Sequence, residues 1–370
     1  MIDSLSIQNF KNLSGLTIPA LSRVNLISGK NNVGKSSLLE ALSLYISDSQ
    51  LMSVLAGRGE NLRSSFKDST DNILRRNYEA LSSLFRNRDN RVSEDNVITI
   101  SDGNNFVSIH FVNYIIETYE LDGSIFRRET VIDDPRRYPN EETYLALEII
   151  RSDDTIVRLP LNKSLDRIKM LIDANRHNFD NLITVNSNYD NADFISKLWD
   201  SITLTEKEDY VIEALRIIEP GIVSLAFLED SFSNVRRERY PVVKVDGMKG
   251  RIPLRSMGDG INHILAIILA LVNCENGCAL VDEIDNGLHY TVQKQLWEII
   301  FKLAKQLNVQ VFATTHSSDC ISSFSKILSQ ADNAREGRYI RLELKKGNVS
   351  QTEYSSGELE IVAAENIEIR

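Results

Sequence analysis

A glycine-rich run near the start of the chain has the residue types and spacing of a phosphate-binding loop. The run from Gly29 to Ser36 matches the pattern GxxxxGK[ST]. Its two glycines let the backbone turn so that consecutive N–H groups point at phosphate oxygens. Lys35 can then reach the β- and γ-phosphates, and Ser36 can offer its hydroxyl to Mg²⁺. A plain glycine turn is the competing interpretation. We expect ATP and Mg²⁺ at a loop formed by Gly29, Asn31, Asn32, Val33, Gly34, Lys35, Ser36 and Ser37.

A pair of carboxylates follows a short apolar run, CALVDE, at residues 278–283. If that run is a buried strand, Asp282 and Glu283 lie at its carboxyl end, the edge where ligands of open α/β sheets bind. Asp282 would hold Mg²⁺, and Glu283 would orient and deprotonate the water that attacks the γ-phosphate. A solvated strand end explains many such pairs, so the prediction depends on the phosphate loop.

A histidine follows a third apolar run, within the segment ATTHSSD at residues 313–319. At the carboxyl end of a strand, His316 could hydrogen-bond the γ-phosphate or the attacking water. A lone histidine is more often structural, but this position beside the other two motifs favours a functional one. The predicted catalytic side chains are therefore Glu283, His316 and Lys35.

A second glycine pattern opens a long apolar run, SMGDGINHILAIILALV. Ser256, Gly258 and Gly260 precede the expected helix, and a helix N-terminus of this kind attracts anions. One nucleotide needs only one such cradle from its own chain. A second cradle suggests contact with the γ-phosphate of a nucleotide bound to another copy. The alternative is an ordinary N-capped core helix.

Hydrophobic periodicity and turn residues indicate the elements that must position these motifs. Residues 2–8 and 22–28 are predicted strands, with an edge strand ending at Pro19 between them. Residues 50–91 and 163–218 carry helical patterns. The stretch between them is rich in strands, as is the stretch from Ile222 to Leu254. The last third predicts helices at 261–273, 290–307 and 317–330 and strands at 278–282, 309–314 and 338–345.

This alternation predicts an α/β fold with a mostly parallel central sheet and an N-terminal antiparallel β element. We expect residues 1–50 and 250–370 to form the ATPase core. Residues 51–249 would form an inserted lobe, β-rich and helical. The absence of sustained heptads excludes a long coiled-coil arm.

Net charge, hydrophobic runs and cysteine content limit the partners and the compartment that we expect for this protein. The formal net charge of −10 argues against blanket adsorption to nucleic acid or anionic membrane, although a local basic groove remains compatible with it. The chain starts without signal-peptide features and has no run long enough to span a bilayer, so we expect a cytoplasmic protein without membrane contact. Three cysteines suit a reducing compartment. Buried or turn thiols explain them better than a metal site does.

Taken in order, the motifs resemble those of ABC-type P-loop ATPases of the SMC, RecF and OLD (overcoming lysogenisation defect) group. The segments SIQNFKNL, GKNNVGKSSLLEAL, SMGDGINHIL, ALVDEIDNGLHY and FATTHSSDCI look especially like OLD-like ATPases of bacterial abortive-infection systems. The ending GELEIVAAENIEIR has the same look. The resemblance covers the first fifty residues and the last hundred and twenty closely, and the middle only in general character.

The resemblance implies an ABC-ATPase head that dimerises around ATP, with a role for each motif. Ser256 to Gly260 would be the signature, Asp282 with Glu283 the Walker B pair, and His316 the switch histidine. Asp285 to His289 would be the D-loop, and Lys11 would lie near the nucleotide. This chain departs from the pattern at His289, where the usual D-loop has aspartate. It also has no glutamine between Gln50 and Gln293 to serve as the Mg²⁺-sensing residue.

OLD nucleases carry a Toprim domain after the ATPase, and the 54 residues after His316 leave no room for one. The resemblance therefore implies a slow ATPase that acts as a sensor or scaffold, in a homodimer or higher oligomer. It would control a separate effector, such as a Toprim-type nuclease, in anti-phage defence. Two alternatives remain: a nucleotide-gated assembly protein with negligible turnover, and a RecF-like ATPase that clamps DNA in repair. Candidate DNA contacts are Arg75, Arg76, Arg86, Arg88 and Arg91, or Arg236, Arg237 and Arg239.

Overall fold

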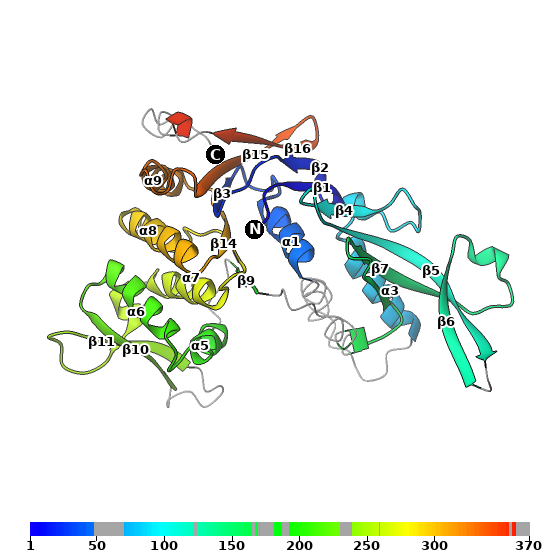
Figure 1. The fold of residues 1–370 in the computed structure, drawn as a ribbon, viewed down its shortest axis with the longest axis horizontal. Helices are drawn as coiled ribbons and strands as arrows, with labels where there is room; N and C mark the ends of the chain where they lie inside the picture. Colours follow the sequence, from blue (N-terminus) through cyan, green and yellow to red (C-terminus); the bar gives the residue numbers. More distant parts are fainter. Residues whose placement is uncertain are drawn as a thin grey trace.

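The described residues form two large sheets and one small sheet with helices between and around them (Figure 1). A computed structural model describes residues 1–47, 70–121, 124–164, 167–168, 170, 181–186, 192–229, 239–258, 260–354 and 357–359. The predicted α/β class is confirmed.

The central sheet has six strands, in the order β16-β15-β3-β14-β13-β9. Neighbouring strands are parallel except for the β15–β16 hairpin at one edge. β3, β14 and β13 are buried along their whole length, as strands of a parallel sheet covered on both faces must be. The strand bounds are β3 Val24–Ser28, β9 Leu182–Val185, β13 Cys278–Val281, β14 Gln310–Thr314, β15 Gly337–Lys345 and β16 Asn348–Tyr354.

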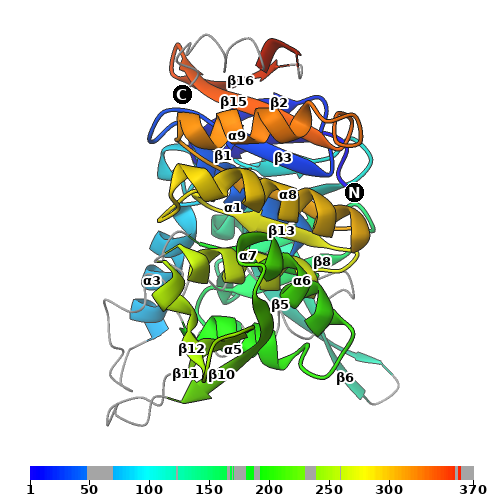
Figure 2. The ribbon, with the colours of Figure 1, turned by 90° about the vertical axis from the view of Figure 1, so that its left-hand side faces the viewer.

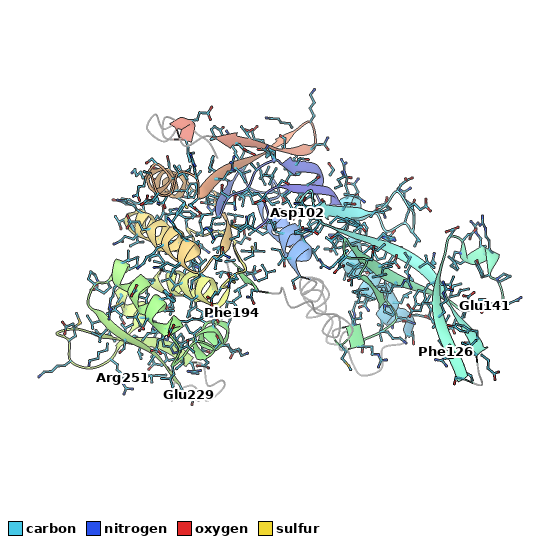
Figure 3. All side chains as sticks on the ribbon, in the orientation of Figure 1. Asp102, Phe126, Glu141, Phe194, Glu229 and Arg251 are labelled. Atoms are coloured by element: carbon cyan, nitrogen blue, oxygen red, sulfur yellow. The ribbon has the colours of Figure 1, made fainter. Side chains whose placement is uncertain are left out.

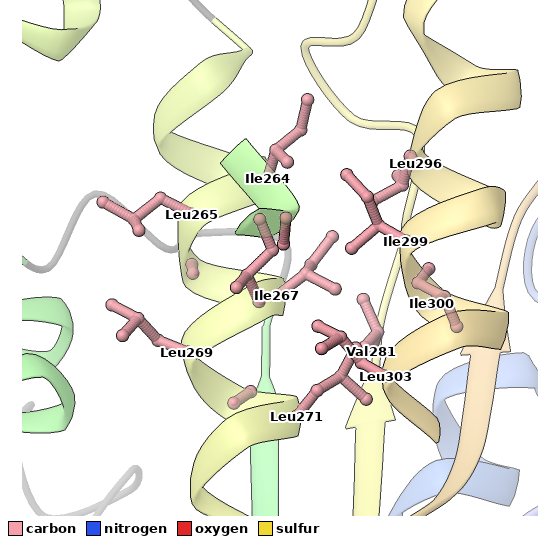
Figure 4. Close-up of a cluster of buried hydrophobic side chains, with 14 of the residues drawn as sticks. Ile264, Leu265, Ile267, Leu269, Leu271, Val281, Leu296, Ile299, Ile300 and Leu303 are labelled. Atoms are coloured by element: carbon pink, nitrogen blue, oxygen red, sulfur yellow. The ribbon is translucent and has the colours of Figure 1, made fainter. Parts of the chain in front are cut away.

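Side chains that alternate along each buried strand divide the interior into two hydrophobic cores. On β14, Val311 and Ala313 point into the core beneath α7 (Ile261–Asn273), α8 (Tyr290–Gln306) and α9 (Ser318–Leu328). Phe312 points into the other core, with α1 (Lys35–Ile46). Figures 1 and 2 show the three helices on one side of the sheet and α1 on the other. Figure 4 shows aliphatic side chains of α7 and α8 meeting beside β13.

A seven-stranded antiparallel sheet lies over the free side of α1. Its order is β2-β1-β4-β5-β7-β8, and β6 also pairs with β5. The predicted N-terminal antiparallel element is therefore present, and strands from the middle of the chain extend it. Helix α3 (Thr70–Ser82) packs into the same core. The strand bounds are β1 Leu5–Phe10, β2 Leu13–Ile18, β4 Ile98–Ser101, β5 Phe106–Leu121, β6 Ser124–Ile132, β7 Thr143–Arg151 and β8 Ile156–Pro160.

A third group of elements covers the outer side of α7. Helices α5 (Ala192–Asp200) and α6 (Lys207–Ile218) share the α7 core with the small sheet. That sheet is formed by β10 (Ile222–Glu229), β11 (Arg239–Val245) and β12 (Ile252–Pro253). Trp199 of α5 packs on Phe227 of β10 with ring centroids 6.2 Å apart. The helix that follows the predicted signature, α7, is thus packed against elements that, among the described residues, do not contact the α1 core.

Two sequence predictions need correction or limitation. The helical prediction for residues 163–218 is wrong at Leu182–Val185, which is strand β9 and pairs in parallel with β13. The peptide of Asn181 seats against Gly277, where an added Cβ would lie 2.0 Å from the Asn181 oxygen. The helical prediction for residues 50–91 is met at Thr70–Ser82 and is wrong at residues 83–91, where the one helical piece is the short 3₁₀ turn Arg86–Arg88; residues 48–69 lie outside the described residues.

The structure also bears on the predictions about the cysteines, a metal site and membrane contact. Cys274, Cys278 and Cys320 are buried and unbonded to one another, and burial raises the pKa of the Cys274 thiol to about 12. Within the described ranges, no three or more histidine, cysteine, aspartate or glutamate side chains gather into a group that could hold a metal ion. Among the same residues, no helix is both long and apolar enough to cross a membrane.

Candidate nucleotide-binding site

The glycine loop lies between β3 and α1, at the carboxyl edge of the parallel sheet. Gly29 has φ +149° and Gly34 has φ +112°, a region that side chains disfavour. An added Cβ at Gly29 would lie 2.6 Å from the backbone oxygen of Leu342, and one at Gly34 would lie 2.8 Å from Asn12. Both glycines are therefore required by conformation and by space. The loop curls over the start of α1, where the helix N–H groups are unpaired.

Lys35 is folded into its own loop. Its Nζ donates to the carbonyl oxygens of Gly29 at 2.8 Å and Lys30 at 3.2 Å, and the residue is only 9% exposed. Burial lowers the pKa of Lys35, and the nearby carboxylates of Asp282, Glu283 and Asp285 oppose that shift. The ammonium is thus held in a loop cage at the sheet edge that carries the acidic residues.

The two predicted Mg²⁺ ligands meet directly. Ser36 Oγ donates to Asp282 Oδ2 at 2.9 Å, across 246 residues of sequence. The other carboxylate oxygen, Oδ1, accepts a 2.5 Å hydrogen bond from Thr314 Oγ1. A hydroxyl and a carboxylate at the edge of a sheet are oxygen ligands of the kind that Mg²⁺ takes. Thr314, at the end of β14, is a partner that the sequence analysis missed.

Glu283 has a backbone conformation that residues other than glycine rarely adopt. Its φ is +52°, in the left-handed region. The conformation is held from β14, because Glu283 N–H donates to Thr314 Oγ1 at 2.9 Å and Ile284 N–H donates to Thr314 O at 2.9 Å. Non-glycine residues in this region cluster at functional sites, where surrounding contacts fix them.

The segment after β14 borders the acidic residues. Thr315 Oγ1 donates to Asp285 Oδ1 at 2.6 Å, and the Ser317 side chain caps α9 by accepting from Cys320 N–H at 3.3 Å. His316 lies between these two anchored residues and is exposed. The structure thus places it at the expected sheet edge, and the described residues offer it no hydrogen-bond partner.

The predicted signature lies across the sheet from the phosphate loop. Ser256 is exposed in a short 3₁₀ turn, and Gly258 is exposed with φ +131°. Helix α7, which follows, packs on the face opposite α1. An added Cβ at Gly260 would lie 2.6 Å from the Gly287 oxygen, so the signature loop abuts the predicted D-loop. Within the described part of the chain, no hydrogen bond joins residues 256–260 to the phosphate loop.

One buried histidine joins α7 to the acidic segment. His263 is fully buried, and its Nε2 lies 3.2 Å from the Ile284 oxygen. Burial lowers the pKa of His263 to about 4, and contacts with the backbone of Ile284 and Glu283 oppose that shift. The neutral ring therefore links the helix that begins at the signature loop to the backbone beside Glu283. Sequence reasoning did not single it out, because it lies in an apolar helical stretch.

Lys11 lies near the loop but has an acidic partner of its own. Its Nζ forms an ion pair with Glu40 of α1. Its neighbour Asn12 touches the loop directly, with Nδ2 donating to Val33 O at 3.2 Å. Of the two residues, Asn12 is the one the structure brings to the phosphate loop.

The two alternative sets of arginines considered as DNA contacts lie on different parts of the molecule, and some of their members have acidic partners. Arg75 pairs with Glu79, Arg91 with Asp89, and Arg239 with Asp200, so three of the charges have carboxylates beside them. Figure 1 shows α3 and β11 at opposite sides of the molecule. Arg236 and Arg237 lie outside the described residues.

Comparison with known proteins gives matches along most of the chain. A family model described as an AAA ATPase domain matches residues 1–321. An ATP/GTP phosphatase of Helicobacter pylori is 24% identical over 360 residues, which is 92% of each chain. Among solved structures, an Smc head bound to the C-terminal winged-helix domain of ScpA aligns with 96% of this chain and 97% of its own, at 14% identity and a TM-score of 0.47. The SMC head domain from Thermotoga maritima aligns with 95% and 98%, at 11% identity and a TM-score of 0.42.

Proposed function

Since the chain belongs to the AAA ATPase domain family, we propose that it hydrolyses ATP with Mg²⁺ at the edge formed by β3, β13 and β14. The observation that carries this proposal is the convergence of Lys35, Ser36 and Asp282 from motifs almost 250 residues apart. The loop binds the phosphates through backbone N–H groups, Lys35 and Ser37. Asn31, Asn32 and Val33 form the crest of the same loop.

The residues present fit a magnesium ion. Ser36 and Asp282 already touch through oxygen atoms, and Thr314 fixes the carboxylate from behind. These two oxygens would be protein ligands, and the ion would neutralise phosphate charge when bound. Lys35 would exchange its two carbonyl contacts for phosphate oxygens.

Glu283 is the proposed general base. The attacking water gives a proton to its carboxylate, a bond forms between the water oxygen and the γ-phosphorus, and the bond to the β–γ bridging oxygen breaks. His316, exposed beside this edge, would hydrogen-bond the γ-phosphate or the water. Thr314 acts as a positioning residue for both acidic side chains.

The site is completed by a second copy of the chain. The signature residues Ser256, Gly258 and Gly260 lie on α7's face of the sheet, so they do not face the phosphate loop of their own chain. In a two-fold dimer each signature would face the partner's γ-phosphate. The abutment of Gly260 on Gly287 would transmit that contact to the D-loop.

For the biological role, we favour a nucleotide-dependent sensor or scaffold that controls a separate effector, such as a nuclease, in anti-phage defence. The support is the resemblance to OLD-like chains. Residues 1–50 and 250–370 are proposed as the ATPase core and residues 51–249 as an inserted β-rich and helical lobe, which also supplies strand β9 to the central sheet. The alternative of a DNA clamp has less support, since three of its candidate arginines are paired within the chain.

The shared site is tested by mixing two inactive variants. Lys35→Ala removes the phosphate cation, and Ser256→Glu places a carboxylate at the exposed signature turn. Each variant alone should be inactive as an ATPase. The mixture should regain a quarter or less of wild-type turnover, because in a mixed dimer only one of the two composite sites has both halves intact.

Ser256→Glu is preferred to Gly258→Asp, because any side chain at φ +131° strains the backbone. Thermal melts establish that both variants fold, and labelled subunits establish exchange. Folded variants that exchange subunits yet stay inactive when mixed would contradict the shared site. An active Ser256→Glu protein would contradict it too.

A further inference from the structure

The outer half of the seven-stranded sheet ends in a projecting two-stranded ribbon. β7 pairs with β5 only from Val107 to Ile115, and β6 pairs with β5 from Asn113 to Leu121. Beyond Ile115, β5 therefore has β6 as its one strand neighbour in the described part of the chain. Figure 1 shows the ribbon extending away from the body, and Figure 3 places Phe126 near its far end.

The ribbon exposes apolar side chains that folding has left uncovered. Ile125 is 73% exposed, Leu121 58% and Tyr119 49%. Phe126 stacks on Tyr119 with ring centroids 5.7 Å apart, and both rings keep large exposed areas. The strand pairing places Tyr119, Leu121 and Phe126 on one face of the ribbon and Ile125 with Val131 on the other, so both faces carry exposed apolar area.

The ribbon also has an open backbone edge. Within the described ranges, β6 pairs with β5 alone, so its other edge presents N–H and C=O groups without a strand partner. An edge of this length that carries apolar residues is a template for pairing with another strand. The question is which strand it accepts.

We propose that β6 pairs antiparallel with β6 of a second copy of this chain, on a two-fold axis through Arg128. In an antiparallel pair, two residues directly opposite each other have their side chains on the same face of the sheet. In a symmetric pair of identical strands this is possible only if the two-fold axis passes through a residue that lies opposite its own copy. Centred on Arg128, the register brings Arg127 opposite Glu129 of the second copy and Ile125 opposite Val131, each contact occurring twice. All four residues are exposed and lie on one face of β6.

Neighbouring registers lose this complementarity. An axis through Arg127 sets that arginine against its copy and puts Ile125 opposite Glu129. An axis through Glu129 sets two glutamates together and puts Arg127 opposite Val131. Opposite charges and apolar pairs stabilise cross-strand contacts, whereas like charges destabilise them, so the Arg128 register is favoured.

The cost of the favoured register is the meeting of two Arg128 side chains. Within each ribbon Arg128 lies directly across from Glu117, which places a carboxylate beside each arginine. Glu129 has one competing contact, because Arg158 Nη1 lies 3.6 Å from its Oε2 while the side chain of Glu129 is 45% exposed. A single strand pair buries less than a standard interface of about 1,600 Å², so we expect a concentration-dependent dimer.

Reciprocal charge reversal tests the register. The measurement is sedimentation without nucleotide in a Lys35→Ala background, which removes the proposed ATP-dependent dimer. Arg127→Glu puts glutamates together twice, and Glu129→Arg puts arginines together twice. Each change should weaken dimerisation about tenfold or more. A mixture of the two should restore it, because every 127–129 contact in the mixed dimer again joins opposite charges.

Controls separate the register from folding. Arg137→Glu, an exposed reversal outside β6, should leave dimerisation unchanged. If Glu129→Arg disturbs the ribbon through Arg158, Ile125→Lys and Val131→Glu form a second complementary pair that should fail singly and recover when mixed. A Lys35→Ala protein that stays monomeric at high concentration would overturn the proposal. Single variants that dimerise like the parent would overturn it too, and neither outcome bears on the nucleotide site.

Discussion

Ser36, at the second position of α1, and Asp282, just after β13, share a 2.9 Å hydrogen bond at the carboxyl edge of the sheet. The contact joins the phosphate loop to the acidic motif, and Thr314 braces it through Asp282 Oδ1. The start of α1, the end of β14 and the residue after β13 therefore meet at one carboxylate.

Loss of the loop cation should abolish nucleotide binding. In Lys35→Ala, the ammonium that the loop holds through Gly29 and Lys30 is gone, and with it the charge-assisted contacts to phosphate. Such contacts are worth about 1.5–3 kcal/mol each, so affinity should fall about 100-fold or more. Titration with a fluorescent ATP analogue measures this. Lys30→Ala, which removes an exposed lysine of the same loop, should bind within a few-fold of the parent.

Removal of the proposed base should separate binding from turnover. Glu283→Gln keeps the shape of the side chain but cannot take a proton from water. The expected result is near-parental ATP affinity with turnover reduced about 100-fold or more. Single-turnover hydrolysis together with sedimentation should show an ATP-bound dimer that persists. Glu298→Gln, which changes a partly exposed glutamate of α8 that pairs with Lys294, is the matched control. Parental turnover in Glu283→Gln would move the base elsewhere, with His316 the first candidate.

The brace behind the acidic pair should affect the metal requirement more than ATP binding. Thr314→Val keeps the volume but loses the hydrogen bonds to Asp282 Oδ1 and from Glu283 N–H. Outer-shell losses of this kind cost about 10–100-fold in metal affinity. We therefore expect hydrolysis to need about tenfold more Mg²⁺ for half-maximal rate. Thr315→Val, which disturbs Asp285 instead, provides the comparison. An unchanged Mg²⁺ dependence would remove Thr314 from the site.

Burial of His263 should make the fold sensitive to acid. Its pKa falls from an ordinary 6.5 to about 4 in the folded chain, so the unfolded chain binds the extra proton between those values. The contribution of neutral His263 to the free energy of unfolding is fully present above pH 6.5 and decreases as the pH falls toward 4. At pH 5 the free energy of unfolding should be lower by about 2 kcal/mol. Urea unfolding at pH 7.5 and pH 5 should show this loss. His263→Leu should lack it, whereas His289→Gln, which changes an exposed histidine, should keep it.

The sequence predicted those parts of the site that lie within one short motif. The spacing in GxxxxGK[ST] sets the loop, and an apolar run followed by two acids sets Asp282 and Glu283 at a strand end. Thr314 and Asn12 could not be identified in this way. Their roles depend on contacts across 32 residues to Asp282 and 21 residues to Val33, and nothing in their local sequence reports those partners.

The same limit applied to the fold. Helices α7 and α8 were predicted within one or two residues, because α7 is one long apolar run and the periodicity of α8 extends over many positions. Strand β9 was missed. Its four residues, LITV, are too few for a period, and pairing with β13 decides their conformation. Strand β6 lies within the stretch predicted to be rich in strands but was not identified individually, because its exposed charged and apolar residues do not alternate as a half-buried strand would.

The strand before the phosphate loop has neighbours that are synthesised very late. Val24 pairs with Val311 on one side and with Gly337 on the other, so β3 has no partner in the sheet until more than three hundred residues exist. During translation the loop therefore emerges on a strand with nothing to hold it. Such long-range closure is slow and exposes apolar segments meanwhile. Nascent chains should be unable to retain ATP, and a chain interrupted before β14 should be a substrate for chaperones and proteases rather than a partly working enzyme.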